Sequence, residues 1–79
     1  MIIFFKSTSL DDTVICIEAT SIYYLSDAMK IAIHTADGMT YTSCAEIDYY
    51  EYLELIKSIK NNNSYNFIDL SDNSFDKQY

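Results

Sequence analysis

The sequence predicts a single α+β domain: a mostly antiparallel sheet of four or five strands with one helix, at about residues 48–61, packed on one face. Three observations predict this fold. Short runs of Ile, Phe, Tyr and Val are separated by polar turns. An Asp-Gly pair stands between two of these runs, and a later stretch changes from strand spacing to helical spacing. The length of 79 residues is that of one domain.

The first third of the chain has the pattern of strands. Residues 2–6 are a block of β-branched and aromatic side chains, which predicts a short buried strand, and residues 7–12 form a polar turn after it. A second strand is predicted over residues 13–18. Residues 21–25 either continue that strand after a bend or form a strand of their own, and the sequence leaves both alternatives open.

The clearest local signal is a hairpin centred on Gly38. Apolar and polar side chains alternate through residues 29–35, and residues 39–44 return as a run rich in Thr and Tyr. Glycine supplies the positive φ that a tight turn needs. The same face of the first strand is predicted to carry Met29, Ile31 and Ile33.

A helix is predicted to begin at Asp48. This residue can cap the helix, and Glu51 stands three residues later, where a capping box places an acid. Tyr49 and Tyr52 fall on the apolar stripe and are expected to face the sheet, whereas Tyr50 is expected to point outward. A final strand is predicted over residues 65–70, so the domain is expected to span residues 1–70. The polar residues 71–79 are expected to form an acidic tail.

The charge balance excludes some classes of function. Twelve carboxylates oppose five lysines and no arginine, which gives a net charge of −7. Affinity for nucleic acid comes chiefly from Lys and Arg, so direct nucleic-acid binding is not expected. An anionic membrane surface is disfavoured for the same reason. A protein with a basic surface stays open as a partner, and so does the simpler alternative that the excess acid only keeps the chain soluble.

Cysteine usage and the N-terminus predict a cytoplasmic protein. Residues 2–5 are an apolar run too short for a signal peptide, and no segment reaches the length of a membrane span. Cys16 and Cys44 lie far apart in sequence and form no C-x-x-C motif. One disulfide is arithmetically allowed, but two lone cysteines in such a chain are more often reduced core residues.

No set of residues indicates catalysis, a metal or a cofactor. His34 is the only histidine, and its spacing from Cys16, Cys44 and Asp37 matches no metal site. A Cys–His pair for nucleophilic catalysis is conceivable, but the domain is small for a substrate pocket. Gly38 stands alone, so there is no glycine-rich phosphate loop. We therefore expect a protein that is not an enzyme.

Acidic and aromatic residues concentrate around the predicted helix and after the last predicted strand. Carboxylates can stand in for phosphates, and a tyrosine ring for a stacked base, on a surface that occupies a Lys- or Arg-lined groove. A plainer explanation exists for the individual acids, since Asp48 can cap the helix and Glu54 can pair with Lys57. The residues predicted to contact a partner are Asp48, Tyr50, Glu51, Glu54, Asp69 and Asp72.

These features predict a small acidic inhibitor or adaptor that binds another protein, one whose basic surface normally takes nucleic acid. Phages and other mobile elements often encode inhibitors of this composition, so an anti-defence role and mimicry of DNA are consistent with it. The alternative from the residues is a self-associating structural module, such as a homodimer formed through a sheet edge or a Tyr-rich face.

A series of short motifs runs from Ile22 to Ser74, about two-thirds of the chain. A strand with the pattern Ile-x-Tyr-x comes first, then a strand ending in Thr-x-Asp-Gly, a return strand with Tyr, a helix and a Phe-Ile strand. This series resembles the LytTR-type DNA-binding domain. The matching pieces are Ile22-Tyr23-Tyr24-Leu25, Ile33-His34-Thr35-Ala36-Asp37-Gly38, Tyr41, residues 52–59 and Phe67-Ile68.

The resemblance implies a sheet with a hairpin and a covering helix. In the family, basic residues after the Phe-Ile strand contact DNA, whereas residues 69–74 here read Asp-Leu-Ser-Asp-Asn-Ser. The basic DNA-contacting residues are thus absent. A diverged LytTR-like transcriptional regulator is the alternative function that the resemblance implies.

Overall fold

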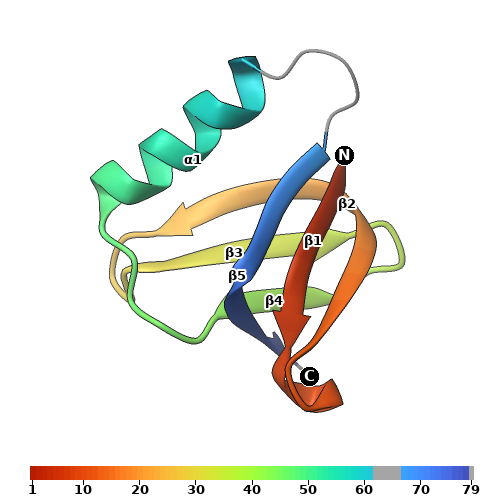
Figure 1. Ribbon diagram of the computed structural model, residues 1–79. Coiled ribbons are helices and arrows are strands. Elements are labelled where there is room, and N and C mark those ends of the chain that lie inside the picture. The colour runs from red at the N-terminus through yellow and green to blue at the C-terminus, as the bar shows by residue number, and fades with distance from the viewer. Residues whose placement is uncertain (62–66, 79) are drawn as a thin grey trace.

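The computed structural model describes residues 1–61 and 67–78, with side chains described through Lys57 and again from Phe67 (Figure 1). Within these described residues, five strands, one α-helix and one short 3-10 helix follow one another. The α+β class with a mostly antiparallel sheet and one helix is confirmed. In order, the elements are β1 (Ile2–Ser7), η1 (Thr8–Leu10), β2 (Thr13–Leu25), β3 (Lys30–Thr35), β4 (Thr40–Ser43), α1 (Tyr49–Asn61) and β5 (Phe67–Gln78).

The five strands close into a barrel in the order β1-β2-β3-β4-β5. Each strand up to β5 pairs antiparallel with the one before it. Because directions alternate along an odd number of strands, the first and last strands run the same way, and β5 pairs parallel with β1. Figure 1 shows β1 and β5 side by side, with α1 outside one end of the barrel. Closure leaves fewer strand edges open to further pairing.

Strand β2 is a single element, which decides between the two alternatives for residues 21–25. Its register with β3 shifts between Ala19, which pairs with Thr35, and Ser21, which pairs with His34. A bulge of this kind bends a strand and increases its twist. The bend lets one strand of 13 residues pair with β1 in its first half and with β3 in its second half.

The barrel interior is filled by the side chains that alternate inward along each strand. Phe5 is fully buried, and its ring lies 4.9 Å from the rings of both Tyr41 and Phe75, centroid to centroid. Burying such rings is the main favourable term in the folding of a small domain. The buried core comprises Ile3, Phe5, Ala19, Ile31, Ile33, Tyr41, Ile47, Ile68, Leu70 and Phe75.

The predicted hairpin is confirmed as β3 and β4. The backbone N–H of Thr35 donates to the Met39 carbonyl at 2.9 Å, and Gly38 has a φ of +90°. The prediction that Met29 shares the core face with Ile31 is wrong. Met29 precedes β3, has a φ of +54° and is exposed, because the turn from β2 reverses the chain there.

The prediction of a polar tail over residues 71–79 is wrong for residues 71–78, which continue β5 to Gln78. Phe75 is fully buried, and β4 pairs with residues 75–78. Polar composition hides this strand, because most of its side chains point outward. The register with β1 jumps from Leu70, opposite Phe5, to Ser74, opposite Lys6, so residues 71–73 form a bulge. Of the predicted strand 65–70, residues 65 and 66 lie outside the described residues.

Candidate protein-binding groove

The start of α1 has the predicted cap. The Glu51 backbone N–H donates to the Asp48 side-chain Oδ1 at 2.9 Å, and the Tyr52 N–H donates to the Asp48 carbonyl at 3.1 Å. The first bond satisfies an N–H group of the first turn that has no acceptor inside the helix, and the second is the first i→i−4 bond of the helix. Asp48 and Glu51 are both exposed, so their charges stand at the end of the helix where the macrodipole favours anions.

Two hydrogen bonds attach the residue before the cap to the barrel. Ile47 donates its backbone N–H to the Met29 carbonyl at 2.7 Å, and its own carbonyl accepts a bond of 2.7 Å from the Tyr24 hydroxyl. The Ile47 side chain is buried in the core cluster. The first turn of α1 is thereby held against the end of β2, and its acidic residues take a defined position.

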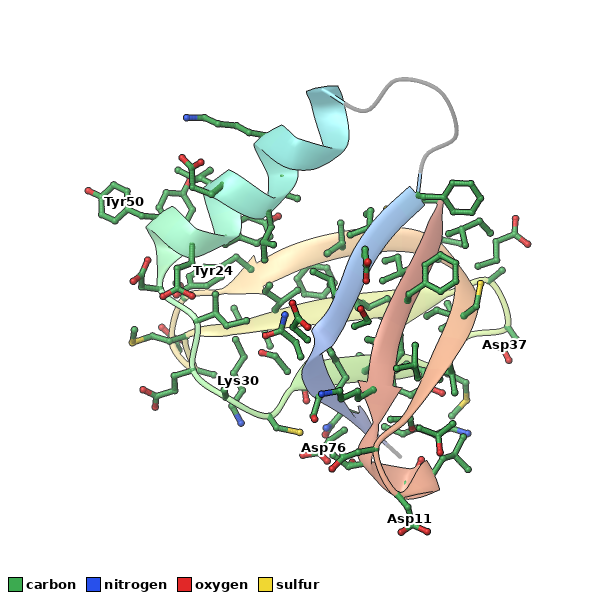
Figure 2. The ribbon with its side chains drawn as sticks, in the orientation of Figure 1. Asp11, Tyr24, Lys30, Asp37, Tyr50 and Asp76 are labelled. Atoms are coloured by element: carbon green, nitrogen blue, oxygen red, sulfur yellow. The ribbon has the colours of Figure 1, made fainter. Side chains whose placement is uncertain are left out.

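Three tyrosines pack together under this first turn. The Tyr24 ring lies 5.3 Å from the Tyr52 ring and 5.6 Å from the Tyr49 ring. Tyr52 is half-buried, as expected for a residue on the apolar stripe, but Tyr49 is 52% exposed despite its contact with Tyr24. Tyr50 is 78% exposed and points away from the barrel, as predicted (Figure 2).

An open groove of about 600 Å³ lies between α1 and the bulge of β5. Four residues of the predicted contact set line it, and all four are exposed: Asp48, Tyr50, Glu51 and Glu54. Its remaining lining is buried Ile47, half-buried Leu55 and half-buried Asn73. The groove therefore combines an apolar base with a carboxylate rim.

Two residues that line the groove, Leu55 and Asn73, are not among the contact residues predicted from the sequence. Leu55 lies one turn beyond Glu51 on the helix, so helical spacing could have found it. Asn73 comes from the β5 bulge, which is a long-range feature that no local pattern encodes.

The pKa of the Tyr24 hydroxyl reflects the negative charge at this end of α1. The pKa is raised by burial first, and then by the negative charges of Asp48, Glu46 and Glu51. The protonated phenol is thus favoured, and it is the form that donates to the Ile47 carbonyl.

The two predicted contact residues of β5 do not line the groove. Asp69 is exposed on β5, where its carboxylate accepts a hydrogen bond from the Ser71 backbone N–H at 2.9 Å. Hydrogen bonding from the Ser71 side chain, and then from its backbone N–H, holds the pKa of Asp69 below its usual value. Asp72 is exposed in the bulge, next to the groove residue Asn73. The groove thus gathers the four helix residues, with Asp72 at its border and Asp69 outside it.

Glu54 also makes the pair expected from its spacing. Its carboxylate lies 3.6 Å from the Lys57 ammonium, and both side chains are well exposed. Exposed pairs of this kind contribute roughly 0–1 kcal/mol, so Glu54 can exchange Lys57 for another cation at small cost.

His34 lies on the outer surface of β3, away from the groove lining. Its Nε2 is 2.8 Å from the Tyr23 hydroxyl, and its Nδ1 is 3.4 Å from the Thr40 hydroxyl. Within residues 1–61 and 67–78, His, Cys, Asp and Glu side chains form no group of three suited to a metal.

The expectation that the cysteines are core residues is wrong, since Cys16 and Cys44 are free and both exposed. Cys16 occupies an outward position of β2, opposite Phe4, and Cys44 follows the end of β4. Burial raises the pKa of the Cys44 thiol, and neighbouring Asp76 raises it further.

Over the part of the chain that the structure describes, no helix combines the length and the apolar character needed to cross a membrane. Comparison with models of protein families, with curated proteins and with solved structures gave no match.

Proposed function

We propose that the protein acts by binding another protein, as a small acidic inhibitor or adaptor with no catalytic chemistry of its own. The observation that carries the proposal is the convergence of Asp48, Tyr50, Glu51 and Glu54 on one open groove. The partner contributes a cationic segment that enters this groove.

The composition of the groove supports a Lys or Arg side chain as the occupant. The aliphatic stem of such a residue packs on the apolar base formed by Ile47 and Leu55, while its charged head meets the carboxylates at the rim. Tyr50 adds an exposed ring beside them, and an aromatic face attracts a guanidinium group.

The position of α1 determines how the acids are presented. We infer that the helix packs on the barrel through the side that carries Tyr52 and Leu55, both in contact with the core cluster. Its other side then holds Glu51, Glu54 and Tyr50 toward the partner.

A basic surface that normally binds nucleic acid is the natural target of such a groove, because carboxylates can replace phosphates. We propose that the protein works in the cytoplasm on a target of this kind. An anti-defence inhibitor from a phage or mobile element is one biological setting for it. The diverged LytTR-like regulator is the alternative proposal, and it requires binding to DNA.

The test is capture of partners from a lysate of the source organism at low and high salt, with bound proteins identified by mass spectrometry. A double variant, Glu51→Gln with Glu54→Gln, removes two charges from the groove while Gln keeps the helix propensity. We expect the variant to lose the basic partner that the wild type captures, and we expect salt to release that partner.

The matched control, Asp11→Asn with Asp12→Asn, removes the same charge at the turn before β2, and Asp11 lies far from Tyr50 (Figure 2). Both positions have positive φ, which Asn tolerates. The control should capture the partner as the wild type does. If both double variants lose the partner equally, net charge alone explains the binding, and a specific role of the groove is contradicted. Binding of duplex DNA by the purified protein at low salt would favour the regulator instead.

A further inference from the structure

The outer surface of β1 and its two neighbours carries several partly exposed apolar side chains. Val14 is 48% exposed and Phe67 is 44% exposed, while Phe4 and Ile2 are half-buried beside them. The Phe4 and Phe67 rings lie 6.0 Å apart. We call this surface the β1 face, and its outward side chains are Ile2, Phe4, Lys6, Val14, Cys16, Glu18, Phe67, Asp69 and Ser74.

The pairing registers place these side chains in rows across three strands. In the first row, Ile2 of β1 stands between Phe67 of β5 and Glu18 of β2. In the second row, Phe4 stands between Asp69 and Cys16. In the third row, Lys6 stands between Ser74 and Val14. Phe4 is therefore the centre of the face.

We propose that the β1 face binds the β1 face of a second copy of this chain. The closed barrel leaves little edge for strand-to-strand association, so a self-contact uses a face. This proposal goes beyond the binding function above and does not depend on it, because none of the groove lining belongs to the face.

The arrangement of charges on the face is what selects a second copy. The three rows form a grid in which Ser74 and Glu18 occupy opposite corners and Phe4 the centre. We consider a two-fold axis that lies in the plane of the face and runs along this diagonal. Spacing along a strand is roughly 7 Å for alternate residues, and spacing across strands is about 4.8 Å. The diagonal therefore exchanges the two directions with an offset of about 3 Å between Lys6 and Asp69, which the long Lys6 side chain can span. Lys6 of each copy then opposes Asp69 of the other.

The same axis also matches the apolar side chains. Val14 of one copy opposes Phe67 of the other, Ile2 opposes Cys16, and Phe4 meets its own counterpart. Self-complementarity of this kind is what an isologous two-fold contact requires. Only Glu18 meets a like charge, because it lies on the axis at the border of the face.

The net charge of the monomer determines how self-association through the β1 face should depend on salt. Each copy carries a net charge of −7, so two copies repel at long range. Salt screens that repulsion, and the apolar contact of the β1 face persists. Association should therefore strengthen with salt, whereas binding of a cation in the groove should weaken, so the two proposals fail or hold separately.

The experiment is sedimentation equilibrium of the full chain, at about 0.05 M and about 0.5 M salt. We expect a monomer–dimer equilibrium that shifts toward dimer at the higher salt. Lys6→Glu turns two attractive contacts into two repulsive ones and should lower the association constant by about tenfold or more. Adding Asp69→Lys to that variant should restore association to within about threefold of wild type. Glu18→Gln should strengthen association.

The matched control is Lys30→Glu, which makes the same change of net charge on β3, outside the β1 face. It should keep an association constant at least about threefold above that of Lys6→Glu. A chain that stays monomeric at about 1 mM in high salt would overturn the proposal. So would equal effects of Lys6→Glu and Lys30→Glu, or a double variant that is not restored. Unfolding curves in urea check that each variant is folded.

Discussion

The hydroxyl of Tyr24 donates a hydrogen bond of 2.7 Å to the carbonyl of Ile47, and this bond joins the end of β2 to the residue before the helix cap. Ile47 in turn donates its N–H to the Met29 carbonyl. Two residues more than twenty positions apart thus set where α1 begins relative to the barrel (Figure 2). The position of the groove depends on this connection.

Replacing Tyr24 by Phe removes the hydroxyl and keeps the ring packed against Tyr52. Because the Ile47 carbonyl then loses its hydrogen-bond donor, we expect the urea midpoint of unfolding to fall. Urea unfolding followed by circular dichroism measures it. The control is Tyr50→Phe, at a 78% exposed ring, which should leave the midpoint unchanged. Equal shifts in the two variants would contradict the role of the Tyr24 bond.

Stability should also fall at alkaline pH. Burial raises the pKa of Tyr24 and Tyr52 above the model-compound value of 10.0. A raised pKa in the folded state means that the protonated phenol is favoured by folding. The contribution is therefore complete below pH 10 and is lost as the pH rises through the higher folded-state pKa.

The measurement is the urea midpoint between neutral and alkaline pH. The variant Tyr24→Phe with Tyr52→Phe should show a shallower alkaline decline than the wild type, since two of the titrating groups are gone. Tyr50→Phe should keep the wild-type slope. If the urea midpoint of the double variant falls with pH as steeply as that of the wild type, other groups cause the alkaline decline in stability. One such group is the Cys44 thiol, whose pKa is also raised.

At acidic pH the Asp37 carboxylate should be the informative group. The Thr35 hydroxyl donates to it inside the β3–β4 turn, and this bond holds the pKa of Asp37 below its usual value of 3.8. A lowered pKa in the folded state stabilises the protein above pH 3.8, and that stabilisation is lost as the pH falls through the folded-state pKa.

The variant Asp37→Asn should be less stable than the wild type at neutral pH, and the difference should narrow in acid. Thermal unfolding at a series of pH values gives both quantities. Asp11→Asn is the matched control for removing one exposed negative charge. A constant difference between Asp37→Asn and wild type at every pH would show that the charge of Asp37 is not the cause.

Truncation after Leu70 tests whether residues 71–78 act as a strand of the barrel or as a dispensable tail. The deletion removes the buried ring of Phe75 and the residues that pair with β4, so the barrel cannot close. Loss of a buried Phe side chain alone costs about 3–5 kcal/mol, a large part of the stability of a small domain. We expect the truncated chain to show no cooperative unfolding transition by circular dichroism.

Asp72→Asn changes the same segment without removing buried surface, and it should unfold as the wild type does. A normal unfolding transition in the truncated chain would show that residues 71–78 are a tail that folding does not require.

The sequence by itself determined the elements whose hydrogen bonds close within a few residues. The turn at Gly38 and the cap at Asp48 are of this kind, because the groups that bond are near neighbours in the chain. The outward direction of Tyr50 follows from helical spacing in the same way. The positions of the groove residues Tyr50, Glu51 and Glu54 on α1, and of Asp48 just before it, were therefore predictable.

Only the tertiary structure decided which distant segments meet. The last eight residues of β5 look polar, yet they are strand because β4 and β1 supply partners and the barrel interior accepts Phe75. Cys16 is exposed because the register of β2 against β1 turns it outward, beside Phe4. Asn73 joins the groove through a bulge in that same pairing. Hydrogen bonds between strands can form at many registers, and the one that buries the most apolar surface prevails, so a local pattern does not contain the answer.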